Sequence, residues 1–244
     1  MKFSLNVAGP DFDDAAIVNF EFAQAALTFR LPKHQSNYGL PILAKPDLQD
    51  ISSFEGELRE HPFGYLYRKI VQQSWYYFDE NTQNKVVKFR LDVEHMNLLP
   101  EQVESNMALR PEKLNQWLFD FLRVMSVDGD ESLLGTPAER ENMIADEMPL
   151  SIDEFEYAKG GLLPWPMVTF GNRSGEEPEW QIYIPLDRSS LLELRLDVGV
   201  FHYHDQGISI PQEQQDQLRR DIRDEFLSHI HINYSPELLA ELGA

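Results

Sequence analysis

One stretch of this chain occurs twice, and this repeat constrains the fold more than any other feature. In the first copy Trp75 begins an apolar strand pattern, a polar turn follows, and a second strand pattern ends at Val93. The same order starts again at Trp180, 105 positions later, and ends at Val198. Both copies close with the residues Arg-Leu-Asp-Val. An internal repeat of this kind indicates that one structural unit is used twice.

An apolar stripe with helical spacing follows each copy at the same offset. The matched residues are Trp117, Phe121, Leu122 and Met125 in the first half, and Ile222, Phe226, Leu227 and Ile230 in the second. Each half therefore has strands followed by a helix. The pattern predicts an α+β fold of two tandem related modules, each an antiparallel sheet with a C-terminal helix packed on it. The alternative is two unrelated hairpin-plus-helix segments, which are common pieces of proteins.

The predicted domain bounds follow from this division. Residues 1–128 form an N-terminal α+β module, residues 129–150 an acidic connector with a short helix, and residues 151–244 a C-terminal α+β module. Alternating apolar residues predict strands at 2–8, 16–22, 26–31, 63–78, 86–93, 153–158, 166–171, 179–186 and 191–203, with a long loop over 33–62. First-turn prolines predict helices from Pro111, over 137–147, from Pro211 to about 230, and from Pro236.

The composition restricts the class of protein. The chain has no cysteine, which excludes a disulfide scaffold, thiolate metal ligands and a cysteine nucleophile, and which fits a reducing compartment. Its first residues do not have the pattern of a signal peptide. No segment approaches the ~20 consecutive apolar residues of a transmembrane helix. The expected location is the cytoplasm.

The negative charge is concentrated in the second half of the chain. The net charge of −20 divides into −5 for residues 1–128 and −15 for residues 129–244. Such a charge opposes binding to a nucleic-acid backbone, which requires cations to displace counterions, and to anionic membranes. It favours a basic protein partner, or simply solubility.

The densest acidic stretch covers residues 128–156, with a net charge of −9 and Arg140 as its one basic residue. Its acidic residues are Asp128, Asp130, Glu131, Glu139, Glu141, Asp146, Glu147, Asp153, Glu154 and Glu156. Opposite charge accelerates association, so these ten residues are the candidate surface for binding a basic partner. Leu133, Leu134, Met143 and Ile144 supply apolar anchors within the stretch. The alternative is a solvated linker whose apolar residues pack on the core.

The recognisable catalytic motifs are missing. The sequence contains no P-loop, no Gly-x-Gly-x-x-Gly and no His-Glu-x-x-His. The segment from Gly171 to Gly175 has the wrong spacing for a nucleophile elbow. We therefore assign no catalytic residue and no cofactor.

One histidine-rich group offers an alternative chemistry. His202 and His204 share one face of a predicted strand and Asp205 follows them, a ligand pattern that suits zinc, iron or copper. His229 and His231 are expected at a helix end, where imidazole interacts favourably with the helix dipole. Polar residues on an exposed strand end and helix end explain all four, so we assign no metal.

The repeated polar residues have a structural explanation. Arg90 and Asp92, and likewise Arg195 and Asp197, are spaced to share a strand face, where we expect exposed ion pairs. Trp75 and Trp180 are expected to be core anchors.

These observations predict a non-catalytic cytoplasmic protein that binds a basic protein partner through an acidic surface. An immunity protein, an antitoxin or a specialised chaperone has this profile. The first alternative is a metal-dependent, hydrolase-like enzyme that uses the histidine-rich face of the C-terminal module. The second is a structural subunit of a larger assembly.

Overall fold

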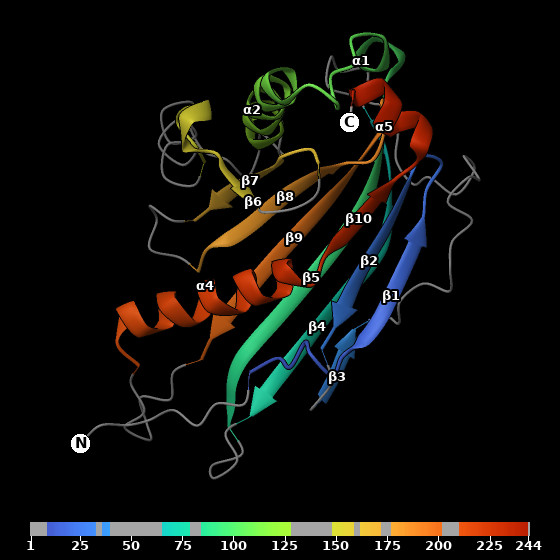
Figure 1. Ribbon diagram of the computed structural model, residues 1–244. Helices are drawn as coiled ribbons and strands as arrows, with labels where there is room; N and C mark the ends of the chain where they lie inside the picture. Colours follow the sequence, from blue (N-terminus) through green and yellow to red (C-terminus); the bar gives the residue numbers. More distant parts are fainter. Residues whose placement is uncertain are drawn as a thin grey trace.

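The protein has an α+β fold built on two antiparallel sheets (Figure 1). The computed structural model describes residues 9–32, 36–39, 65–78, 84–127, 148–158, 162–171, 177–201 and 210–243. The larger sheet has seven strands in the order β3-β4-β5-β9-β8-β7-β6, and the smaller sheet has three in the order β1-β2-β10.

The strands of the larger sheet are β3 (Ser36–Gly39), β4 (Tyr65–Phe78), β5 (Lys85–Leu98), β6 (Glu156–Ala158), β7 (Trp165–Phe170), β8 (Glu179–Pro185) and β9 (Ser190–Val200). The smaller sheet contains β1 (Ala16–Glu21), β2 (Ala25–Leu31) and β10 (His231–Tyr234). The helices are α1 (Pro100–Glu104), α2 (Pro111–Val127), α4 (Gln212–Ser228) and α5 (Pro236–Leu242), with a 3-10 helix η2 (Ile152–Glu154) before β6.

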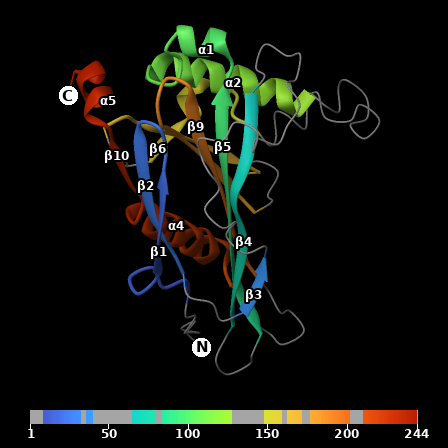
Figure 2. The same cartoon turned by 90° about the vertical axis from the view of Figure 1, so that its right-hand side faces the viewer.

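Helix α4 and the smaller sheet lie side by side on one face of the larger sheet (Figures 1 and 2). Phe226 of α4 is fully buried where the three elements meet. Its ring centroid lies 5.4 Å from that of Phe89 on β5 and 6.4 Å from that of Phe29 on β2. Trp75 and Trp180 are buried in the same core, which confirms their prediction as core anchors.

Helix α2 packs against the opposite face of the larger sheet. Successive side chains of a strand point to opposite faces, so Phe89 and Met96 of β5 belong to different layers. Met96 lies in a second core with Trp117, Leu118 and Phe121 of α2. The larger sheet is therefore covered by helices on both faces, although α2 covers only the end near Met96 (Figure 2).

The two Arg-Leu-Asp-Val segments pair with each other at the centre of the larger sheet. Strands β5 and β9 are antiparallel, with Leu91 opposite Leu196. In this register Arg90 lies opposite Asp197 and Asp92 lies opposite Arg195. The repeat therefore places unlike charges across from each other, the favourable arrangement for cross-strand pairs.

Most predicted elements have counterparts in the structure, and the α+β class is confirmed. Each sheet combines strands from both predicted modules, because β5 pairs with β9 and β2 pairs with β10. A duplication, and the division into residues 1–128, 129–150 and 151–244, stay predictions. The strand at 2–8 and the helix at 137–147 lie outside the described residues.

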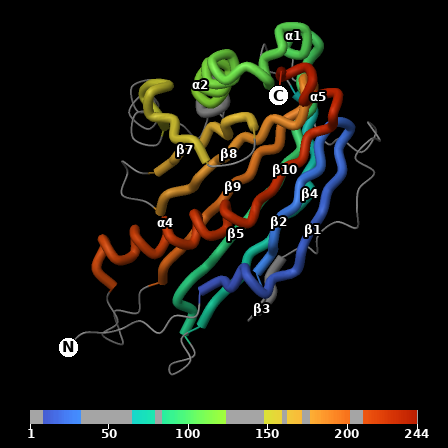
Figure 3. The backbone as a smooth tube through the Cα atoms, viewed as in Figure 1, coloured from blue at the N-terminus to red at the C-terminus, as the bar shows by residue number. Residues whose placement is uncertain are grey.

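Three local predictions were wrong. The segment predicted as one strand over 153–158 begins with η2, and only its last three residues form β6. His231 starts strand β10 instead of ending a helix, since α4 ends at Ser228 and the chain then continues antiparallel to β2 (Figure 3). The predicted loop over 33–62 includes β3, which pairs with β4.

Candidate functional site

Strand β6 forms one end of the seven-stranded sheet. In the described part of the chain it pairs only with β7, with Tyr157 opposite Pro166. An edge strand presents unpaired backbone N–H and C=O groups, which form a template for another strand. This edge is therefore the first place to look for a binding function.

Local contacts hold the edge strand in place. Phe155, between η2 and β6, is buried in the core beneath α2. The Glu154 carboxylate accepts a hydrogen bond from the Leu150 backbone N–H at 3.2 Å. On the α2 side, the Asn115 side-chain amide donates to the Tyr157 hydroxyl at 2.5 Å. The edge is therefore ordered before any partner arrives, which reduces the entropic cost of binding.

Apolar and acidic side chains are both exposed around β6. Four large hydrophobic residues are exposed in the described part of the chain, and three of them, Leu150, Tyr157 and Leu162, flank or belong to β6. Asp153, Glu154 and Glu156 are exposed in the same segment. We call these six residues the edge surface. Exposed apolar residues are ordinary when scattered, but grouped apolar residues with a polar rim are typical of protein-binding sites.

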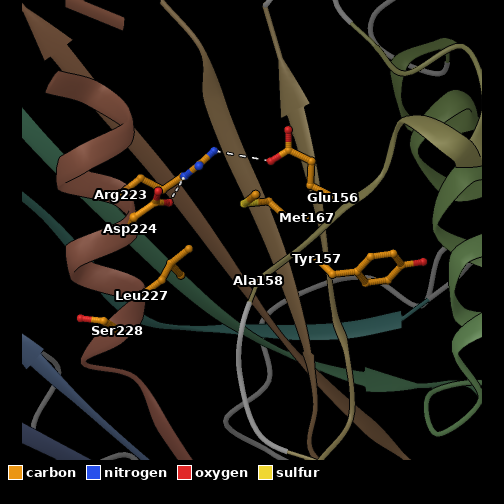
Figure 4. A pocket seen from close by; sticks show the side chains of 8 residues that line it. All are labelled: Glu156, Tyr157, Ala158, Met167, Arg223, Asp224, Leu227 and Ser228. Atoms are coloured by element: carbon orange, nitrogen blue, oxygen red, sulfur yellow. Dashed lines mark hydrogen bonds and ion pairs between the residues drawn. The ribbon is translucent and has the colours of Figure 1, made fainter. Parts of the chain in front are cut away.

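A cavity of about 300 Å³ lies between β6 and α4 (Figure 4). Its apolar lining comes from Ala158 and Met167 of the sheet and Leu227 of α4, all of which are buried. Its polar lining includes Glu156, Arg223 and Asp224. The cavity thus combines an apolar floor with a charged rim.

Arg223 is held in a fixed position at this rim. Its Nη1 lies 3.6 Å from Glu156 Oε2, and its Nε donates to Asp224 Oδ1 at 2.8 Å. Its guanidinium also stacks over the Trp180 ring, 5.1 Å from the centroid, as cation–π pairs do. Two carboxylates face one cation here, so the rim keeps a net negative charge that favours a basic group.

A second cluster of charges lies at the centre of the sheet, between β5 and β9. Glu94 lies directly opposite Glu193, and both are buried. Arg195 lies between the two carboxylates and offsets part of their charge, since its Nε donates to Glu193 Oε1 at 2.9 Å and its Nη2 lies 3.8 Å from Glu94 Oε2. Burial, followed by the charge of Glu193, raises the pKa of the Glu94 carboxyl, and Arg195 opposes that rise.

The repeated arginines therefore have different partners. Arg90 donates to Asp92 at 2.6 Å, which confirms the first expected ion pair, although Asp92 is buried and not exposed. In the second copy both residues also form ion pairs, but with other partners: Arg195 bonds Glu193, and Asp197 accepts from Lys88 of the neighbouring strand at 2.5 Å. The reason is that Glu94 and Glu193 are buried and require a cation between them.

The structure describes three of the ten predicted acidic residues. Asp153, Glu154 and Glu156 all belong to the edge surface, and Glu156 also lines the cavity. The other seven lie outside the described residues: Asp128, Asp130, Glu131, Glu139, Glu141, Asp146 and Glu147. The apolar anchors predicted with them, at 133, 134, 143 and 144, lie outside as well.

Of the four histidines singled out in the sequence, the structure describes two. His202 and His204 lie outside the described residues. His229 caps α4 with its ring near Phe12 and its Nε2 3.7 Å from Asp13 Oδ1, while His231 begins β10 with an exposed side chain. Within the described ranges, no group of three or more His, Asp or Glu residues is arranged to hold a metal ion. A metal-dependent activity stays a prediction.

Sequence reasoning missed the apolar half of the site. Tyr157 and Leu150 were not singled out, because a single apolar residue in a strand or turn pattern predicts burial as readily as exposure. Arg223 and Asp224 were missed as well, because only the apolar stripe of their helix was singled out. The proximity of Glu156 to α4 depends on tertiary packing, which no local pattern encodes.

Comparison of the chain with protein-family models, with curated proteins and with solved structures finds no match. None of the helices in the described ranges is long and apolar enough to cross a membrane. The case for a function therefore depends on the chemistry of the edge surface and its cavity.

Proposed function

We propose that this chain is a non-catalytic protein-binding protein that engages a basic protein partner through an acidic surface, of which the edge surface is the described part. The observation that carries the proposal is the combination of an ordered edge strand, exposed acids and exposed apolar residues in one segment. Apolar area supplies affinity, and the acids accelerate association with a basic partner.

The distribution of charge supports the same proposal. Elsewhere in the described structure, several charges are neutralised internally, as in the pairs of Lys88 with Asp197 and of Arg219 with Glu177. Asp153, Glu154 and Glu156 are exposed, and the contact of Glu156 with Arg223 is long, at 3.6 Å. These carboxylates remain able to attract a cationic partner.

The proposal extends to the biological class and the origin of the fold. A cytoplasmic immunity protein, antitoxin or specialised chaperone would combine a net charge of −20 with a dedicated binding edge. We also propose that the two halves descend from duplication of one sheet-and-helix module. The offset of 105 positions and the pairing of the two Arg-Leu-Asp-Val segments support this origin.

The test is co-purification with three forms of the full chain. The acid-edge variant carries Asp153→Asn, Glu154→Gln and Glu156→Gln. The acid-control variant carries Glu21→Gln, Glu101→Gln and Glu104→Gln, which removes the same charge from exposed positions on β1 and α1. A partner retained at low salt is then purified, and its Kd is measured with each form.

We expect the partner to be basic and its affinity for the acid-edge variant to be about tenfold lower than for the native protein, with a larger loss at low salt than at high salt. Its affinity for the acid-control variant should be nearly unchanged. Equal loss in both variants would mean that only the overall charge matters. Retention of no partner, or of an acidic one, would contradict the proposal.

A further inference from the structure

We propose that the partner binds by adding a strand to the edge of β6, with basic side chains at alternate positions directed into the cavity beside α4. This inference rests on the proposed function and specifies how the partner is recognised. In strand addition, main-chain hydrogen bonds supply affinity and pockets for alternate side chains supply specificity. The described edge has both the open strand and the pocket.

The alternation of side chains on β6 defines what each partner residue would meet. All three residues of β6 line the cavity, but Glu156 lies toward α4, whereas the Tyr157 ring points toward α2 (Figure 4). Residues opposite each other on paired strands share a face, so alternate partner residues would point toward the cavity. The intervening residue would lie beside the exposed ring of Tyr157.

The cavity suits a lysine or arginine side chain, because its lining is apolar in one part and acidic in another. A basic side chain has an apolar stem that packs on hydrophobic surface and a charged head that remains near polar groups. Met167 and Leu227 would contact the stem, and the carboxylates of Glu156 and Asp224 would lie near the head. The intervening residue is expected to be apolar, since Tyr157 and Leu150 are exposed on this edge. The recognised segment is therefore extended, with basic and apolar residues in alternation.

A second copy of this chain fits the same edge poorly. Edge-to-edge pairing of two copies would bring the acids of one β6 close to those of the other, and like charges across a strand pair are destabilising. Charged and short edge strands are a means by which proteins avoid such self-association. The same acids that repel a second copy attract a basic strand, so the edge selects a partner of opposite charge.

The test uses a capped eight-residue peptide of alternating lysine and valine as the probe, with Kd measured by calorimetry against the full-length protein. A glutamate–valine peptide controls for charge. A lysine–valine peptide methylated on every backbone nitrogen keeps each side chain and charge but loses the N–H groups that a strand pair needs. We expect the methylated peptide and the glutamate–valine peptide each to bind at least about tenfold more weakly than the probe.

The protein offers a matched pair of variants for the cavity. Ser228 lines the cavity and its hydroxyl donates to the Glu225 carbonyl, while Ser105 lies at the end of α1 and its hydroxyl donates to the Gln102 carbonyl in the same way. Ser228→Phe places a ring at the cavity and should raise the Kd of the probe by about tenfold, because the ring occupies the volume that the basic side chain would fill. Ser105→Phe makes an equivalent change away from the cavity and should leave the Kd unchanged.

The possible outcomes separate this inference from the proposed function. Equal binding of the methylated and unmethylated peptides, or equal effects of Ser228→Phe and Ser105→Phe, would overturn strand addition. In that case the proposed function would still stand if the acid-edge variant lost its partner. Dimerisation of the protein through the same edge, observed by sedimentation and abolished by Ser228→Phe, would also overturn the inference in favour of a second copy.

Discussion

The centre and the edge of the seven-stranded sheet use the same acidic side chains in opposite ways. At the centre, Glu193 has 2% of its side chain exposed and Glu94 has 8%, and Arg195 lies between them. At the edge, the Glu156 side chain is 60% exposed and lies beside an open cavity. The comparison indicates that the repeated strands hold the scaffold together, whereas the exposed residues of the edge surface lie outside the repeat.

The largest expected effect comes from the buried layer that joins the two sheets. Phe226 contacts both sheets and is fully buried, so Phe226→Ala should lower the free energy of unfolding by about 3–5 kcal/mol, through lost burial and the cavity left behind. Leu162→Ala at the exposed edge should change it by less than about 0.5 kcal/mol. Urea denaturation measures both. Similar losses for the two variants would mean that the edge is as important for stability as the core.

A smaller effect is expected at the centre, where the repeat itself supplies the control. Arg195→Met leaves two buried carboxylates without their cation and should cost about 2–3 kcal/mol, less than a fully buried pair because Arg195 is 38% exposed. Arg90 is its counterpart in the first copy and is 43% exposed, so Arg90→Met should cost at most about 1 kcal/mol. Equal costs, again from urea denaturation, would mean that the two copies are energetically equivalent.

The smallest effect concerns the pH dependence of stability at the same centre. The raised pKa of Glu94 means that the folded protein binds the proton of this carboxyl more tightly than the unfolded chain does. Protonation of Glu94 therefore stabilises the folded state. This contribution is complete at pH values below the unfolded pKa and is lost as the pH rises through the folded pKa. Glu94→Gln removes the ionisation. We expect the variant to gain stability relative to the native protein as pH rises from 4 to 7.

Denaturation curves across the pH range measure the difference. If Glu94→Gln lost stability relative to the native protein as pH rose, the attraction of Arg195 would outweigh burial, and the description of the centre would be wrong.

The sequence predicted regular elements better than their assembly. Strong patterns such as the alternation over β2 and the apolar stripe of α4 predict burial on one face, and both elements form. Strand β10 was missed because its four residues, from His231 to Tyr234, are too short to show a period and gain their pairing from β2. The pairing of Glu94 with Glu193 depends on the register between β5 and β9, and local sequence does not specify that register.

The candidate site was predicted only in part, for the same reason. Asp153, Glu154 and Glu156 were chosen for charge density, a property that sequence displays directly. The cavity forms between α4 and the strands β6 and β7, and its lining residues Met167 and Leu227 are far apart in sequence. Only tertiary packing brings these residues beside Glu156.

The most direct test of the central claim is backbone amide hydrogen exchange with and without the lysine–valine peptide. Exchange reports local opening and protection residue by residue. If the edge is the docking site and the centre is already satisfied, the peptide should slow exchange at residues 156–158 and leave β5 and β9 unchanged. Unchanged exchange at 156–158 while the peptide is bound, or new protection confined to another part of the protein, would contradict this account.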